Sequence, residues 1–120
     1  MINYGKQTLN SLDCKEVLKV LKSDFITQGR IINNFEKQIS SKFGSKYCTA
    51  VSNGTAALHL AGLSLGWKEN DIILTSPLSF LSSANCILYC NATPEFVDIN
   101  EKTFTIDPNN VEDRIKFYKK

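Results

Sequence analysis

Residues 52–55, Ser-Asn-Gly-Thr, form the stretch whose backbone and side chains are best suited to chemistry. They follow a short apolar run, residues 47–51, and precede a run of helix-forming residues. The first amides of a helix have no partner within the helix, and the helix dipole makes that end partly positive. Gly54 permits close approach of a ligand because it has no Cβ, and Thr55 adds a hydroxyl. The turn is therefore predicted to bind an anion, and a phosphate group suits it.

The same turn has a simpler interpretation as a helix cap. Ser52, Asn53 and Thr55 are residue types that cap helices, and a helix needs such a cap whether or not a ligand binds. A single glycine is also a weaker signal than a full glycine-rich phosphate loop. On local sequence alone, the cap and the anion site both stay open.

The remaining reactive side chains give weaker signals. The four cysteines, at positions 14, 48, 86 and 90, lack paired C-x-x-C spacing, which favours reduced thiols in the core over disulfides. Cys86 and Cys90 share one helical face, but a metal ion would need two further ligands, and the chain has one histidine. That residue, His59, is expected to pack in the interior. We therefore predict no metal site.

Hydrophobic spacing predicts the elements that must position the turn. Apolar residues at helical spacing indicate two amphipathic helices, at about residues 11–24 and 30–43, and Gly44 is expected to end the second. The helix after the turn is apolar on nearly every side, which predicts that it is buried all round. The other predicted elements are strands at 47–51, 71–75 and 93–99 and helices at 79–90 and from Pro108 onwards.

The order of these elements predicts the fold class. Strands separated by helices need crossover connections, so we expect an α/β protein with α-β-α layers and a mainly parallel sheet. Ligands bind such sheets outside the carboxyl ends of the strands, where residues 52–55 and the turn at residues 77–80 are both expected. Asn91 is predicted to adopt a left-handed conformation after its helix, and Asp107 to cap the last helix.

Composition sets broad limits on the class of protein. At 120 residues and 42% hydrophobic content, a single domain is the default expectation. The net charge of +2, from 14 basic and 12 acidic residues, gives no indication of a nucleic-acid or anionic-membrane partner. No signal peptide opens the chain and no apolar run is long enough to cross a bilayer, so a cytoplasmic location is expected.

Three motifs then occur in order along the chain. Residues 24–29 read Asp-Phe-Ile-Thr-Gln-Gly, residues 52–58 read Ser-Asn-Gly-Thr-Ala-Ala-Leu, and residues 75–80 read Thr-Ser-Pro-Leu-Ser-Phe. Together they resemble the DegT/DnrJ/EryC1/StrS family of sugar aminotransferases, which depend on pyridoxal phosphate. The resemblance covers essentially the whole chain. It is greatest to members that aminate a UDP-linked 4-keto-6-deoxy sugar in pseudaminic acid biosynthesis.

This resemblance implies a fold and a set of site residues. The fold would be the amino-terminal part of the pyridoxal-phosphate-binding large domain of an aspartate-aminotransferase-like protein of fold type I. The amides of Gly54 and Thr55, beside Asn53, would hold the cofactor phosphate. Phe80 would lie against the pyridine ring, because an aromatic face suits a planar, electron-poor ring. Three residues before the second helix fall where the family lines its sugar pocket: Thr27, Gln28 and Gly29.

The resemblance also implies partners and a missing group. A homodimer, a nucleotide-sugar substrate and an amino-acid donor are expected, with glutamate as the donor. The lysine that forms the Schiff base in this family lies beyond residue 120, so we predict no catalytic residue here, a truncated reading frame and no transaminase activity of this chain alone. Three alternatives stay open: a pyridoxal-phosphate-dependent sugar dehydratase of the same family, a non-catalytic phosphate- or nucleotide-binding module, and an α/β fragment without a ligand.

Overall fold

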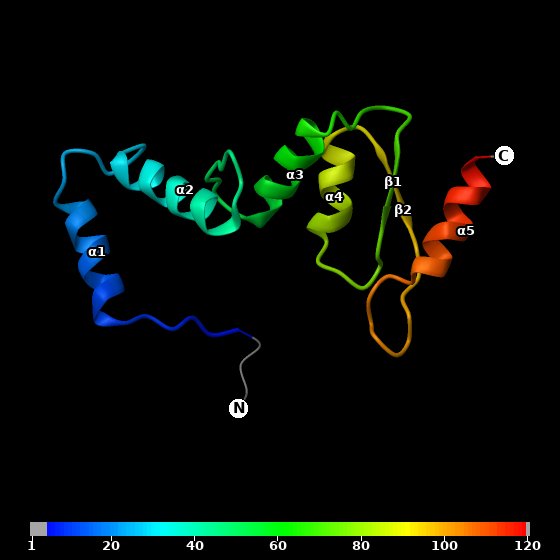
Figure 1. Ribbon diagram of the computed structural model, residues 1–120, viewed down its shortest axis with the longest axis horizontal. Helices are drawn as coiled ribbons and strands as arrows, with labels where there is room; N and C mark the ends of the chain where they lie inside the picture. The colour runs from blue at the N-terminus through cyan, green and yellow to red at the C-terminus, as the bar shows by residue number, and fades with distance from the viewer. Residues whose placement is uncertain (1–4, 120) are drawn as a thin grey trace. The chain divides into compact units, whose positions relative to one another are not determined.

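The computed structural model, drawn in Figure 1, describes residues 5–119. The chain divides into two compact units. Unit 1 extends to residue 50, and unit 2 begins at residue 51. Unit 1 contains α1 (Ser11–Leu21) and α2 (Arg30–Phe43). Unit 2 contains α3 (Gly54–Ser64), β1 (Ile72–Thr75), α4 (Ser82–Tyr89), β2 (Thr93–Phe96) and α5 (Pro108–Tyr118).

Local capping explains the helices of unit 1. Asn10 and Asp13 form a capping box at the start of α1, in which each side chain accepts a hydrogen bond from the other residue's backbone N–H. This helix ends three residues earlier than predicted, because the hydroxyl of Ser23 donates to the carbonyl of Val20 and closes the last turn. The predicted bounds of α2 are confirmed, and Gly44 ends it in the left-handed conformation, with φ +65°.

Residues 47–51 do not form a strand, so this prediction is wrong. A strand needs a neighbouring strand for its backbone hydrogen bonds, and within residues 5–119 β1 and β2 pair with each other alone. The segment is instead attached to α2 through a side chain, because the amide of Ala50 donates to the carboxylate of Glu36 at 2.8 Å. The apolar pattern of residues 47–51 therefore indicated a segment with the composition of a strand, but it could not indicate whether another strand lies beside it.

The sheet of unit 2 positions the remaining helices. β1 and β2 are parallel, with Ile72 opposite Thr93 and Thr75 opposite Phe96. α4 is the crossover between them and packs on both strands, while an Arg114–Glu95 ion pair of 3.1 Å ties α5 to β2. Figure 1 shows α4 on one side of the two strands and α5 on the other. The predicted α-β-α layers and parallel sheet are confirmed.

Turn chemistry in unit 2 also follows the sequence. Asn91 takes φ +59° one residue after Cys90, the C-cap of α4. Asp107 caps α5 by accepting a hydrogen bond of 2.8 Å from the amide of Asn109. β2 ends at Phe96, three residues earlier than predicted, and residues 99 and 106 then form an isolated antiparallel bridge. The two predicted caps are therefore confirmed, and the third strand is shorter than expected.

The apolar core lies beneath α4. Cys86, Ile87 and Ala92 are buried there, with Trp67 and Ile73 packed against them. In unit 1, by contrast, no described residue is buried. Among the residues that the structure describes, no helix is long and apolar enough to cross a membrane.

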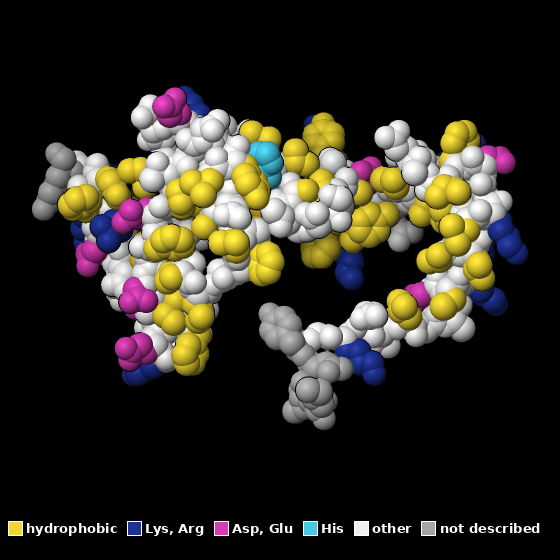
Figure 2. Space-filling view, turned by 180° about the vertical axis from the view of Figure 1, so that it is seen from behind, with side chains coloured by type: hydrophobic (Ala, Val, Ile, Leu, Met, Phe, Trp, Pro, Cys, Tyr) yellow, Lys and Arg dark blue, Asp and Glu magenta, His cyan; other side chains and the backbone are white. Residues whose placement is uncertain are grey.

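The expectation that α3 is buried all round is wrong. α4 packs on one side of α3, and Gly62 is the buried residue of this helix. Leucines on its other sides remain 41 to 51% exposed: Leu58, Leu60 and Leu63. Figure 2 shows many apolar side chains at the surface. An apolar helix can be buried only where another element covers it, and α4 covers one face. His59 lies half-buried, with its ring edge-on to Tyr89 at 5.4 Å.

Candidate functional site

Asn53 makes the helix cap that the simpler interpretation requires. Its backbone is extended, and its side-chain oxygen accepts a hydrogen bond of 2.9 Å from the amide of Ala56. The carbonyl of Asn53 accepts the first intrahelical hydrogen bond, from Ala57 at 3.1 Å. The Asn53 amide group also donates to the hydroxyl of Ser52 at 3.3 Å. Asn53 therefore orients the start of α3, and its carboxamide oxygen is already engaged.

The amides of Gly54 and Thr55 remain free after this cap is made. Within residues 5–119, neither N–H donates to a protein acceptor. A Cβ placed on Gly54 would meet no atom within 4 Å, so the space beside this residue is open. Two unpaired donors at the positive end of a helix are the arrangement that holds a phosphate group. The Asn53 cap therefore leaves these two amides without a protein acceptor, and the anion site stays a prediction that the cap does not exclude.

Phe80 lies in the loop between β1 and α4. The structure starts α4 at Ser82, later than predicted, because the preceding turn is made by polar side chains: the hydroxyl of Ser76 accepts from the amide of Leu78 at 3.3 Å. Phe80 therefore precedes the helix, and this residue is 77% exposed. Figure 1 shows that α3 and α4 begin at the end of unit 2 where β1 and β2 finish. The amides of α3 and the Phe80 loop thus share one end of the sheet.

The predicted sugar-contacting residues form one loop of unit 1. Thr27 and Gln28 are exposed, and Gln28 has a left-handed backbone with φ +54°. Gly29 begins α2 as its N-cap, and a Cβ there would lie 3.2 Å from the carbonyl oxygen of Phe25. The backbone of residue 25 therefore passes close to Gly29, while the side chains of Thr27 and Gln28 are accessible to a ligand.

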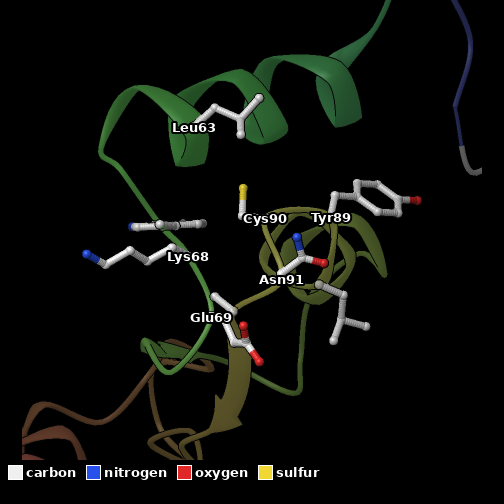
Figure 3. Close-up of a pocket in the computed structure, with 9 residues that line it drawn as sticks. Leu63, Lys68, Glu69, Tyr89, Cys90 and Asn91 are labelled. Carbon is white, nitrogen blue, oxygen red and sulfur yellow. The ribbon is translucent and has the colours of Figure 1, made fainter.

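A large cleft lies elsewhere in unit 2. It has a volume of about 820 Å³ and is formed where α3 and α4 end, the opposite ends of these helices from Gly54 and from the Phe80 loop. Figure 3 shows Leu63 above Cys90 and Asn91, with Lys68 on the facing turn. None of the predicted site residues lines this cleft. The predicted phosphate site is an exposed helix terminus, and cavity size alone would not have located it.

The lysines and the cysteines of the described chain differ in their exposure to solvent. Every lysine from residue 5 to residue 119 is exposed, whereas an amine nucleophile needs a desolvated setting or a neighbouring cation. Burial, and then the neighbouring Cys90, raise the pKa of the Cys86 thiol, which keeps it neutral. All four cysteines are free thiols. Within the same residues, no group of three metal-ligating side chains comes together.

Comparisons with known proteins identify the family of this chain. The model of the DegT/DnrJ/EryC1/StrS aminotransferase family matches residues 7–120. The UDP-4-amino-4,6-dideoxy-N-acetyl-beta-L-altrosamine transaminase of Campylobacter jejuni is 36% identical over 96% of this chain and 30% of its own length.

Solved structures of similar proteins give the same picture. PseC of Helicobacter pylori, an aminotransferase involved in the biosynthesis of pseudoaminic acid, superposes with a TM-score of 0.85 at 31% identity, over 92% of this chain and 30% of PseC. NtdA of Bacillus subtilis, solved with bound cofactor PMP, superposes with a TM-score of 0.77 at 30% identity, over 88% and 25%. The chain therefore spans about 25 to 30% of the length of these relatives.

Proposed function

The chain belongs to the DegT/DnrJ/EryC1/StrS aminotransferase family, and on that premise we propose that it supplies the cofactor-phosphate site of a pyridoxal-phosphate-dependent sugar aminotransferase. The observation that supports this most directly is the pair of free amides at Gly54 and Thr55. A cap alone would need neither of them, because Asn53 already satisfies the amide of Ala56.

The described residues fit the phosphate and the ring of this cofactor. The phosphate carries negative charge, which the amino-terminal end of α3 favours, and the open space at Gly54 lets an oxygen approach both amides. The hydroxyl of Thr55 is a further donor. Phe80 is exposed, so its ring is accessible and can stack against the planar ring of the cofactor. When bound, pyridoxal phosphate supplies an electron sink for the carbon that carries the amine.

The substrate proposal rests on the loop at residues 27–29 and on the relatives. We propose a UDP-linked 4-keto-6-deoxy sugar as the amino acceptor, glutamate as the donor and a homodimer as the working assembly, in a cytoplasmic pathway of nucleotide-sugar synthesis for surface glycans. The names of the Campylobacter and Helicobacter proteins support a sugar of this class. Thr27 and Gln28 would donate to sugar or nucleotide oxygens, because both side chains are exposed.

This proposal assigns no catalytic amine to the described residues. Since all their lysines are exposed, we expect no turnover by the 120-residue chain alone. Within the proposal, the Schiff-base lysine belongs to a further segment of the working enzyme. What this chain contributes is binding and orientation of the cofactor.

Binding of pyridoxamine 5′-phosphate tests the proposed phosphate site. This probe has no aldehyde, so it cannot react with surface lysines. We expect its addition to shift the amide resonances of Gly54 and Thr55 in a two-dimensional NMR spectrum of the labelled chain. Pyridoxamine, which lacks the phosphate, should leave them in place.

Two pairs of variants sharpen this test. Gly54→Val places side-chain carbons where the phosphate would approach, and we expect about tenfold weaker binding, or roughly 1.4 kcal/mol. Gly5→Val, also in open space but outside the site, is its control. Phe80→Leu should weaken binding by roughly 1 kcal/mol through loss of stacking, whereas Phe43→Leu, another exposed phenylalanine, should not. Equal binding of both pyridoxamine compounds, or normal binding by Gly54→Val, would refute the proposal.

A further inference from the structure

A second polar pocket lies within unit 1, with a volume of about 300 Å³. One wall is a single face of α2, because its lining residues on this helix are spaced at i, i+3, i+4 and i+7: Asn33, Glu36, Lys37 and Ser40. The other wall is formed by residues 46–48, where the chain turns back after the left-handed Gly44. The pocket therefore exists because this segment runs beside α2.

Hydrogen bonds from α2 fix the returning segment on both sides of the pocket. The hydroxyl of Ser40 donates to the carbonyl of Ser45, and the Ser45 amide donates to the carbonyl of Ser40. At the other end, the carboxylate of Glu36 accepts the amide of Ala50 at 2.8 Å in a partly buried setting. These contacts hold residues 46–48 in place without strand pairing.

The charge of this pocket is net positive. Lys37 and Lys46 both line it, and within the described residues neither ammonium group has a carboxylate within 4 Å. Glu36 is the acidic residue in the lining, and it already accepts from Ala50. The Nζ of Lys46 lies 5.2 Å from the centre of the Tyr47 ring, a cation–π distance that holds it near the ring.

We propose that this pocket binds the phosphate group of a small phosphorylated compound. Two ammonium groups free of carboxylate partners attract a dianion, and charge-assisted hydrogen bonds from ammonium to phosphate are about twice as strong as neutral ones. The side-chain carboxamide of Asn33, another lining residue, can add a neutral donor. Tyr47 is 78% exposed, so its ring offers an apolar face to the rest of the ligand. The volume is at the lower end of the range for small-molecule sites, which limits the ligand to a compact one.

This site is separate from the phosphate site of the proposed function, since none of its lining residues belongs to α3 or its cap. The test is a titration of the labelled 120-residue chain with inorganic phosphate, glucose 1-phosphate and glucose, at constant ionic strength set with sodium chloride. The amide resonances of Tyr47 and Cys48 report on this pocket, and those of Gly54 and Thr55 report on the α3 site.

We expect saturable shifts at Tyr47 and Cys48 with both phosphate compounds and none with glucose. Tighter binding of glucose 1-phosphate would identify a sugar phosphate as the ligand, and equal affinities would identify the phosphate group alone. Lys37→Gln and Lys46→Gln should each weaken binding about fivefold, and the pair should abolish it at accessible concentrations. Lys42→Gln, an exposed lysine of α2 outside the lining, is the matched control.

Three results would overturn the inference: shifts of equal size with sodium chloride alone, unchanged affinity in the double lysine variant, or equal losses in the Lys42→Gln control. Far-UV circular dichroism of each variant checks that α2 remains folded. If only Gly54 and Thr55 respond to phosphate, this inference fails and the proposed function stands. If Tyr47 and Cys48 respond to phosphate while Gly54 and Thr55 do not respond to pyridoxamine 5′-phosphate, this inference stands and the proposed function fails.

Discussion

Replacement of Gly62 by alanine should destabilise unit 2, although alanine is the better helix former. A Cβ at this position would lie 2.5 Å from Cε3 of Trp67 and 2.9 Å from Sγ of Cys90. Ordinary contact begins at 3.4 Å, so the indole would have to retreat by about 0.9 Å. Cys90 is only 4% exposed and cannot move outward freely. The packing of Trp67 and Cys90 therefore requires a glycine at position 62, although the helix itself would accept an alanine there.

The change in unfolding free energy of Gly62→Ala is the difference between an overpacking cost and a gain in helix propensity. Overpacking of a core by a methyl group costs typically 1–3 kcal/mol, and an aromatic ring in collision places Gly62→Ala in the upper part of that range. The higher helix propensity of alanine stabilises the variant by about 1 kcal/mol. We expect a net loss of roughly 1–2 kcal/mol. Gly54→Ala is the matched control, because its new Cβ meets no atom within 4 Å. Its effect should stay within about 0.5 kcal/mol.

Urea unfolding measures this effect, followed by the fluorescence of Trp67 and by far-UV circular dichroism. The chain has one tryptophan, so its emission reports on the site of the collision and should shift to longer wavelength in Gly62→Ala. In a Trp67→Phe background the atoms that collide are gone, and the alanine should become nearly neutral. Equal or greater stability of Gly62→Ala in the wild-type background would refute this reasoning.

Two further predictions concern titratable groups. A thiol reagent should label the exposed Cys14 at once in the native chain, while Cys86 and Cys90 should react only in denaturant. Both of these thiols are buried, and burial raises the pKa of Cys86. Rapid labelling of Cys86 in the native chain would contradict this prediction. Hydrogen bonds from the amide of Asn109, and then from the side chain of Asn100, lower the pKa of the Asp107 carboxyl in the folded chain. Ionised Asp107 therefore contributes its full stabilisation above the ordinary pKa of 3.8, and this stabilisation is lost as the pH falls through the lower pKa of the folded state. The difference in stability between wild type and Asp107→Ala should therefore be constant near neutrality and shrink in acid; a constant difference down to the lowest pH would exclude this effect.

Features set by adjacent residues could be predicted from the sequence. Gly44 and Asn91 take left-handed conformations, and Asp107 caps α5, because each depends on a few neighbouring backbone groups. The parallel sheet was predictable because a crossover helix separates β1 from β2. The two amides at the start of α3 follow from the same local logic, since every helix leaves its first donors unpaired.

Features that depend on distant partners could not be predicted. Residues 47–51 have strand-like composition, yet a strand exists only where another strand accepts its hydrogen bonds. The apolar faces of α3 were expected to be covered, but sequence pattern gives no information on which element covers a face. The bond from Ala50 to Glu36 joins residues fourteen positions apart, and no local signal distinguishes Glu36 from the other charged residues of α2.

The stability of α3 connects the Gly62 contact to the proposed phosphate site. α3 has 11 residues, and isolated helices shorter than about 12–15 residues are marginal in water. Its packing on α4, where Gly62 meets Trp67 and Cys90, is therefore what keeps the helix formed. The free amides of Gly54 and Thr55 point in a common direction only while the helix exists, because their orientation is that of the helix axis. A substitution at the carboxyl end of α3 that disturbs Trp67 is thus expected to weaken the proposed phosphate binding at the amino end without contact with the ligand. The site depends on the core beneath α4 as much as on the two residues that would hold the phosphate.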